Sequence, residues 1–325
     1  MKPRLLTSPS STIRAGLLGL VLAGAACAAA AHDTWFEPRP SPPGTALLAL
    51  GTGNRFPRHD SGLGAEFLTR QGCRSATGVA LALRSDRNAA DAVSVLLLRP
   101  VHRAASTASH CWAQLQPFDV EVAPALVPVY LNEIRASAAV RSAWAALQAR
   151  GLPWKERYTK HARIMLRTPP GVVATVGTEP AADLGLDIIA NAGTSPLRVG
   201  QTLDVRVLRD GEPLAGLALE LRSELSPIGI WHQTDAQGRL GVRLPLAGRW
   251  LLRGVDLHLA NADGTEVTDP ADADHWASRF VTLAFEVEPA DRADQNPSSL
   301  RLNARSANQT AAIAAISSEP PTRTP

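Results

Sequence analysis

The sequence predicts a mostly β protein, built from Ig-like antiparallel β-sandwich modules with a short helical insertion between them. Short runs rich in Val, Leu and other apolar residues recur along the chain, and clusters of Gly, Pro and Asp separate them. Asp210-Gly211 stands between two alternating runs, which is a typical hairpin signal. Near residue 140 the pattern changes to an Ala-rich one that favours helix.

The chain begins with a segment that predicts export. Residues 1–31 combine a positively charged start, an uncharged apolar run at 15–26 and four alanines at 28–31. This order is typical of a cleaved signal peptide. The apolar run is shorter than the roughly 20 residues that a membrane-spanning helix needs. We therefore expect a periplasmic mature chain without a transmembrane span.

Charge argues against a nucleic-acid partner. The whole chain has 33 Lys and Arg against 30 Asp and Glu, and residues 1–31 hold three basic and no acidic side chains. The rest of the chain is therefore close to neutral. A nucleic-acid-binding surface needs a basic stripe, and the sequence has none.

Two cysteines remain after residue 31, and they predict a disulfide between Cys73 and Cys111. In an oxidising compartment two cysteines usually pair. Closing a loop of this size would stabilise the fold by roughly 4 kcal/mol in the chain-entropy model. Two buried free thiols are the alternative. A metal-ligand role is less favoured because a CxxC spacing is absent.

The first ordered part is expected to be an N-terminal β domain over residues 32–128. Three runs of strand length support it, at 46–50, 78–84 and 92–98.

Residues 129–170 are expected to be helical. The Ala-rich run at 140–150 predicts one helix, which Gly151 ends. Pro153 suits the first turn of a second helix. At 100° per residue four side chains would share the buried face of that second helix. They are Trp154, Tyr158, His161 and Met165.

The last ordered part, 185–288, predicts a C-terminal Ig-like β-sandwich. The hairpin at Asp210-Gly211 is followed by a second pair of runs with Gly238 and Gly248 in the turns. Residues 289–325 are polar and repetitive, and we expect them to form a disordered tail.

Several segments in a fixed order resemble one periplasmic family. They are HDTWFEP, LPWKERYTKHARIML, DGEPLAGLALEL, TDAQGRLGVRLP, GRWLLRGVDLH and HWASRFVTLAFEV. Together they are similar to the family of domain of unknown function 4198, also described as NikM-like or CbiK-like components of nickel and cobalt transport. The resemblance covers nearly all of residues 32–288. It implies a β-rich periplasmic protein that binds a divalent metal, nickel or cobalt, with copper as the alternative.

The resemblance also indicates candidate metal ligands. His32 matches the family's histidine at the mature N-terminus, and His161 lies in the matching segment, where the family often has an aromatic residue. The family commonly has a histidine six residues after the Trp of GRW. Asp256 stands there in this sequence, and His258 follows two residues later, on the same face of a strand. Either is a candidate ligand.

His32 has a chemical argument of its own. Cleavage after Ala31 would free its amine beside its imidazole Nδ1, and the two nitrogens can chelate one metal, as in a histidine brace. Imidazole suits Zn, Cu, Fe and Ni. A second imidazole from His161 or His258 would complete the site, and Asp33 and Glu37 are expected to add oxygen ligands or to orient the ring.

Each candidate has an alternative explanation. Cleavage one or two residues earlier would leave His32 as an ordinary strand start. His161 is equally explained as a core histidine bonded to a backbone carbonyl, and His258 as a residue buried with Trp250 and Leu252.

Motifs of known enzyme classes are absent, so we expect a protein that is not an enzyme. The sequence has no GxSxG, HExxH or Walker motif. The favoured function is a periplasmic metal-binding accessory protein whose partner is a membrane metal transporter or an outer-membrane receptor. The alternative is a non-catalytic Ig-like module of the cell envelope with a structural or ligand-binding role.

Overall fold

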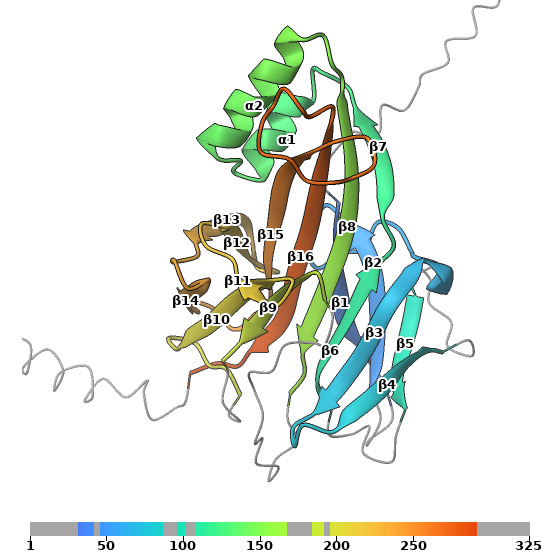
Figure 1. Cartoon of the computed structure of the whole chain (residues 1–325). Helices are drawn as coiled ribbons and strands as arrows, with labels where there is room; N and C mark the ends of the chain where they lie inside the picture. Colours follow the sequence, from blue (N-terminus) through green and yellow to red (C-terminus); the bar gives the residue numbers. More distant parts are fainter. Residues whose placement is uncertain are drawn as a thin grey trace, which may run out of the picture.

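The computed structural model describes residues 32–41, 46–86, 96–101, 108–167, 184–191 and 196–290. The predicted signal peptide and almost all of the predicted tail lie outside the described residues. Within them the protein is mostly β, as predicted, with two α-helices. Figure 1 shows three long strands at the centre, the helices at one end of them and a small sheet beside the other.

Twelve strands of the described residues form one large sheet, and four form a smaller one. In sheet order the large sheet contains β1 (Asp33–Arg39), β2 (Leu47–Gly53), β5 (Leu96–Val101), β4 (Ala80–Ser85), β3 (Leu68–Ser75), β6 (Ala108–Leu115), β8 (Trp154–Met165), β16 (His275–Val287), β15 (Gly248–Ala260), β12 (Ala218–Ser223) and β13 (Ser226–Gln233), with β7 (Phe118–Val122) also paired to β8. The small sheet contains β11 (Glu212–Pro213), β10 (Thr202–Arg209) and β14 (Arg239–Arg243), with β9 (Leu186–Ala190) paired to β10.

The long strands β8, β16 and β15 organise the molecule. β16 pairs antiparallel with β15 and parallel with β8. Successive side chains of a strand point to opposite sides, so these three strands present two faces. One face, which carries Leu252, Val281 and Leu283, packs against the small sheet. We call it the sandwich face. The opposite face, which carries Ala162, Arg253 and Thr282, is called the N-terminal face because β1 packs on it.

Two separate apolar clusters cover the N-terminal face. Beneath β1, Trp35 and Phe36 pack with Ala162, Ile164 and neighbours. Further along the strands, helices α1 (Val127–Glu133) and α2 (Ala138–Ala149) cover a second cluster that includes the stacked rings of Trp154 and Trp276, whose centroids are 4.4 Å apart. The Ser137 side chain caps α2 by accepting a hydrogen bond from the Val140 backbone N–H.

Two local predictions are confirmed. Asp210 and Gly211 both have positive φ, 51° and 87°, as the tight turn between β10 and β11 requires. The Cys73–Cys111 disulfide joins β3 to β6, where the two residues are direct partners across the strands.

The predicted second helix is wrong, because residues 154–165 form strand β8. Lys155 and Arg157 are exposed between buried neighbours, which is the alternation of a strand. Residues 161–164, however, are buried on both faces, and this hides the alternation in the sequence. The helical segment therefore ends at Ala149 and not near residue 170.

The division into two β domains stays a prediction. The large sheet crosses the expected boundary, because β8 connects β6 of the N-terminal part to β16 of the C-terminal part. The sandwich predicted for 185–288 has its two layers in the small sheet and the strands β12, β15 and β16.

Candidate functional site

The chain enters the N-terminal face at His32, which is half-buried and stands directly before β1. Asp33, the first residue of β1, is only 2% exposed, and its Oδ2 accepts a hydrogen bond of 2.8 Å from Nη1 of Arg253 on β15. The carbonyl oxygen of Thr34 accepts a 2.6 Å bond from Oγ1 of Thr282 on β16. The residues next to His32 are therefore fixed to two of the three long strands.

Arg253 is the centre of a buried charge cluster. Its Nε donates to Oε2 of Glu220 on β12 at 2.7 Å, while Nη1 reaches Asp33. Its Nη2 also lies 3.4 Å from the carbonyl oxygen of Glu133 at the end of α1. The nearby carboxylates hold the guanidinium charged against the cost of burial, and the pKa of Arg253 is raised. One cation thus connects β1, β12 and the helical region.

Further along the same face lies a buried carboxyl, that of Glu156 on β8. It accepts hydrogen bonds from Tyr130 Oη of α1 at 2.9 Å, from Trp154 Nε1 at 2.7 Å and from Ser278 Oγ. Burial raises the pKa of Glu156 although all three bonds act in the opposite direction. Burial and this carboxyl together raise the pKa of Tyr130 well above its usual value. The cluster attaches α1 to the sheet.

Lys160 lies between these two groups. It lies four residues after Glu156 on β8, so the two side chains share the N-terminal face. Burial lowers its pKa to about 8, while the charge of Asp33 acts to raise it. Its Nζ lies 5.5 Å from the centroid of the Tyr158 ring.

We call this set of side chains the polar seam. Its part around Arg253 lies between the apolar cluster beneath β1 and the cluster beneath the helices, and its part around Glu156 lies inside the second of these clusters. Its members are Asp33, Tyr130, Glu156, Lys160, Glu220, Arg253, Ser278 and Thr282.

One polar atom of the seam has no partner. Oδ1 of Asp33 is buried and accepts no hydrogen bond from any described residue. An unsatisfied buried acceptor lowers the stability of the fold. A further hydrogen-bond donor or a cation bound at this oxygen would remove that cost. This oxygen belongs to the residue that follows His32.

His161 does not lie near His32. Its neighbour in register, Val281, belongs to the sandwich cluster, whereas Ala162 faces β1. The imidazole Nδ1 donates to the carbonyl oxygen of Phe280 at 3.1 Å, and Nε2 lies against Gly185. Burial lowers the pKa of His161 to about 4. The ring is thus on the sandwich face, as a core histidine.

Asp256 and His258 are neighbours of each other but also lie away from His32. His258 Nε2 is 2.7 Å from Asp256 Oδ1, and Arg209 Nε is 3.1 Å from Asp256 Oδ2. Two residues apart on β15, they share the sandwich face with Leu252. Arg209, a residue of the small sheet, confirms the direction in which Asp256 points.

Glu37 lies at the other end of β1. It pairs with Arg39 and Arg249, and His59 Nδ1 is 3.9 Å from its Oε2. Five residues of extended chain separate it from His32, a span of roughly 16 Å. Glu37 is therefore no neighbour of the His32 ring.

The predicted ligand set is therefore divided: Asp33 alone lies beside His32, and Asp256 and His258 form a separate pair on the sandwich face. In the part of the chain that the structure describes, no group of three or more His, Cys, Asp or Glu side chains is placed to hold a metal ion. Sequence reasoning missed Glu156, Lys160, Glu220 and Arg253. For Arg253 and Glu220 the signal is a charged residue within an apolar run, as in LLRGV and LALEL, whereas Glu156 and Lys160 lie in a strand with several charged residues and have no such signal.

Comparison with known proteins gives one match. The model of the family described as "Domain of unknown function (DUF4198)" matches residues 29–255. No curated protein matches the chain. None of the described helices combines the length and the apolar character that a membrane span requires.

Proposed function

Because the chain belongs to the family of domain of unknown function 4198, we propose that it is an exported metal-binding accessory protein of the nickel or cobalt uptake type. In this proposal the mature chain begins at His32 in the periplasm. Its terminal amine and its imidazole bind one divalent transition metal, with copper as the alternative ion. The partner is a membrane metal transporter or an outer-membrane receptor.

The observation that carries the proposal is the anchoring of β1. Asp33 and Thr34 are held by Arg253 and Thr282, so the position of His32 is restricted before any ion binds. Ligands that are already ordered lose little conformational entropy on binding. An imidazole with an adjacent amine suits a borderline divalent ion, and the free Oδ1 of Asp33 suits an oxygen ligand or an outer partner of the site.

The donor set supports transfer of the metal rather than permanent storage. The chain supplies two nitrogens and one carboxylate at this place, because His161 and His258 face the other side of the sheet. Such a set leaves coordination positions for water or for ligands of a receiving protein. We expect a bound ion to be exchangeable.

The test compares two forms of the N-terminus by calorimetric titration with Ni²⁺. One form begins at His32, and the other retains Ala31. Because one extra residue converts the amine into an amide, we expect the longer form to bind at least about tenfold more weakly. His258→Ala is the matched control, and its affinity should equal that of the parent. Equal affinity of the two N-terminal forms would remove the proposal.

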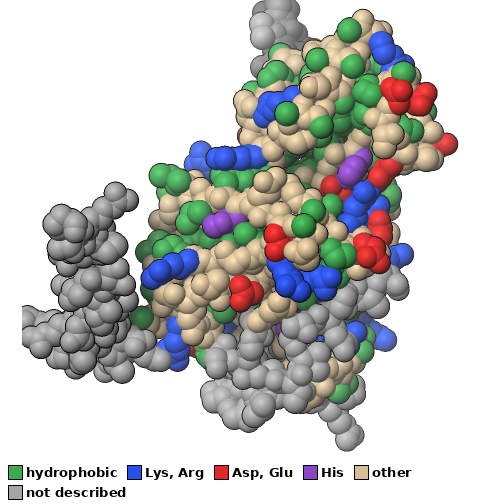
Figure 2. All heavy atoms as spheres, turned by 60° about the vertical axis from the view of Figure 1, so that its left-hand side comes forward, with side chains coloured by type: hydrophobic (Ala, Val, Ile, Leu, Met, Phe, Trp, Pro, Cys, Tyr) green, Lys and Arg blue, Asp and Glu red, His purple; other side chains and the backbone are tan. Residues whose placement is uncertain are grey.

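A second candidate is the non-catalytic Ig-like module. It is favoured by β13, the last strand of the large sheet, which carries no charged residue and exposes Ile228 and Ile230 by 77% and 41%. Edge strands are usually protected by charge. Figure 2 turns the side of the molecule that carries β13 forward and shows hydrophobic side chains on its surface. An absence of metal after purification from metal-replete cells would favour this candidate.

A further inference from the structure

The small sheet has a pocket of about 560 Å³ on its outer surface, away from the polar seam. Strand β10 alternates there between two environments. Leu203, Val205 and Val207 belong to the sandwich core, so the side chains of Arg206 and Leu208 point to the other side. Ile189 of β9, the register partner of Arg206, completes an apolar floor with Leu208.

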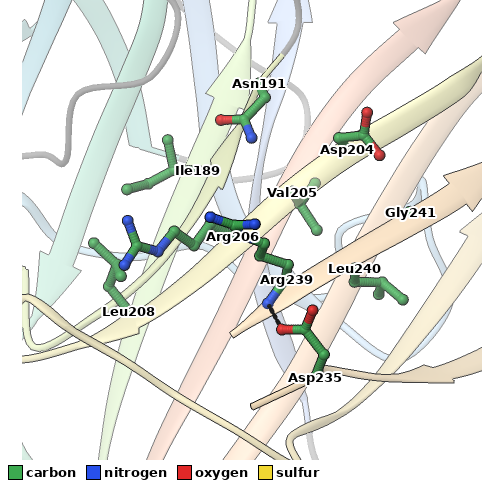
Figure 3. Close-up of a pocket in the computed structure, with 10 residues that line it drawn as sticks. All are labelled: Ile189, Asn191, Asp204, Val205, Arg206, Leu208, Asp235, Arg239, Leu240 and Gly241. Carbon is green, nitrogen blue, oxygen red and sulfur yellow. Dashed lines mark hydrogen bonds between the residues drawn. The ribbon is translucent and has the colours of Figure 1, made fainter. Parts of the chain in front are cut away.

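Two arginines stand directly opposite each other in this pocket. Arg206 of β10 and Arg239 of β14 are partners in the strand register, and both line the cavity. Figure 3 draws both side chains over the region between Asn191 and Leu208. Like charges at directly opposite positions destabilise a sheet. Their pairing therefore has a cost that a bound anion would remove.

Neither guanidinium is neutralised within the described part of the chain. Among the described residues, no ion pair involves Arg206 or Arg239, whereas arginines such as Arg163 and Arg253 are paired with carboxylates. Nε of Arg206 is buried and has no hydrogen-bond partner there. An orphaned donor on a cation is the more costly kind of unsatisfied group.

Of the two carboxylates that line the pocket, that of Asp235 is engaged in a turn. Asp235 Oδ1 accepts the backbone N–H groups of Gln237 and Arg239 in the turn before β14. In Figure 3, Asp204 and Asp235 lie on the side of the pocket opposite Ile189 and Leu208. They leave the two guanidinium groups available to a ligand.

We propose that this pocket binds a small organic carboxylate. Arg206 and Arg239 would hold the carboxylate by charge-assisted hydrogen bonds, and Asn191 supplies a further polar contact. Ile189 and Leu208 would contact the hydrocarbon part. This apolar floor distinguishes an organic acid from inorganic phosphate, which gains nothing from it. The volume lies within the range of small-molecule sites. The inference does not depend on metal binding by His32.

The test uses the mature protein and three probes in calorimetric titrations. Hexanoate represents the ligand class, hexanamide is its uncharged counterpart, and inorganic phosphate is the competing oxyanion. We expect saturable binding of hexanoate and none of hexanamide. Arg206→Gln and Arg239→Gln should each weaken hexanoate binding at least about tenfold. Arg243→Gln is the matched control, since Arg243 is exposed on β14 outside the pocket, and should stay within about twofold.

A second readout keeps the proposal testable if a variant fails to fold. In the parent protein, hexanoate should shift the Arg206 Nε–Hε resonance in an ¹⁵N-correlated NMR spectrum. No saturable binding of hexanoate, or no shift of this resonance, would overturn the proposal. Tighter binding of phosphate than of hexanoate would overturn it as well, because the pocket would then be an inorganic oxyanion site.

Discussion

The two faces of the β8–β16–β15 sheet are formed by the same strands but differ in the side chains that they bury. On the sandwich face, residues such as Leu252, Val281 and Leu283 form a large apolar cluster, and the buried Arg163–Asp187 ion pair lies on the same face. On the N-terminal face, the polar seam interrupts the apolar packing with Asp33 and Arg253. An apolar core stabilises the fold but tolerates different apolar side chains at each position. A buried ion pair is tolerated only when its two charged groups are held in the right geometry.

This difference indicates what the seam contributes. Replacing a buried ion pair by apolar residues often stabilises a protein, so the seam is poor evidence for stability as such. It does fix the first residue of β1 and the end of α1 relative to β15. We therefore interpret the apolar cluster of the sandwich face as the stabilising part and the seam as the positioning part.

The largest expected effect comes from breaking the seam at its centre. Arg253→Met leaves the carboxylates of Asp33 and Glu220 buried without their cation, so we expect a loss of about 3–5 kcal/mol in the free energy of unfolding, measured in urea. Arg222→Met is the control. Arg222 also contacts Glu220, but its side chain is 26% exposed, and its loss should cost at most about 1 kcal/mol. Equal losses of stability for the two variants would show that water reaches and screens the charges of the seam.

A second experiment tests the sandwich face through pH. The pKa of His161 is about 4 in the fold against an ordinary 6.5, so the unfolded chain binds this proton more readily. The free energy of unfolding is unaffected above pH 6.5 and falls as pH decreases from 6.5 towards 4, by about 2 kcal/mol at pH 5. His161→Gln should lack this part of the pH dependence in matched thermal or urea unfolding. If the stability of the parent protein and of His161→Gln changed with pH in the same way, protonation of the His161 ring would not destabilise the fold.

The smallest expected effect concerns the second half of the seam. Tyr130→Phe removes one of three donors to Glu156 and should cost about 1 kcal/mol in urea unfolding, since two donors remain. Tyr158→Phe serves as the control, because the Tyr158 hydroxyl makes no hydrogen bond to the described residues. A loss above about 3 kcal/mol for Tyr130→Phe would mean that α1 no longer packs on the sheet once this hydrogen bond is removed.

The comparison also separates what sequence could predict from what it could not. The hairpin at Asp210-Gly211 follows from local turn chemistry, and the Cys73–Cys111 pair from the cysteine count of the chain after residue 31. Strand β8 was missed because burial on both faces removes its alternation, and because Lys, Glu and Arg favour helices until tertiary packing overrides them.

The polar seam could not be predicted from the sequence for a different reason. Arg253 and Asp33 lie 220 positions apart, and no periodicity connects them. For His161 the sequence placed the residue on a buried surface but could not say which side of a sheet it would face. That side decides whether His161 meets His32 or Phe280.

The bond between Asp33 and Arg253 has a consequence for the order in which the molecule assembles. Ribosomes make a chain from its N-terminus, so β1 is synthesised long before Arg253, its partner cation. Contacts between distant parts of a chain form slowly, because a long loop must close first. The earliest residues to arrive are thus among the last to find their place, and a protease would have its longest access to them during that interval.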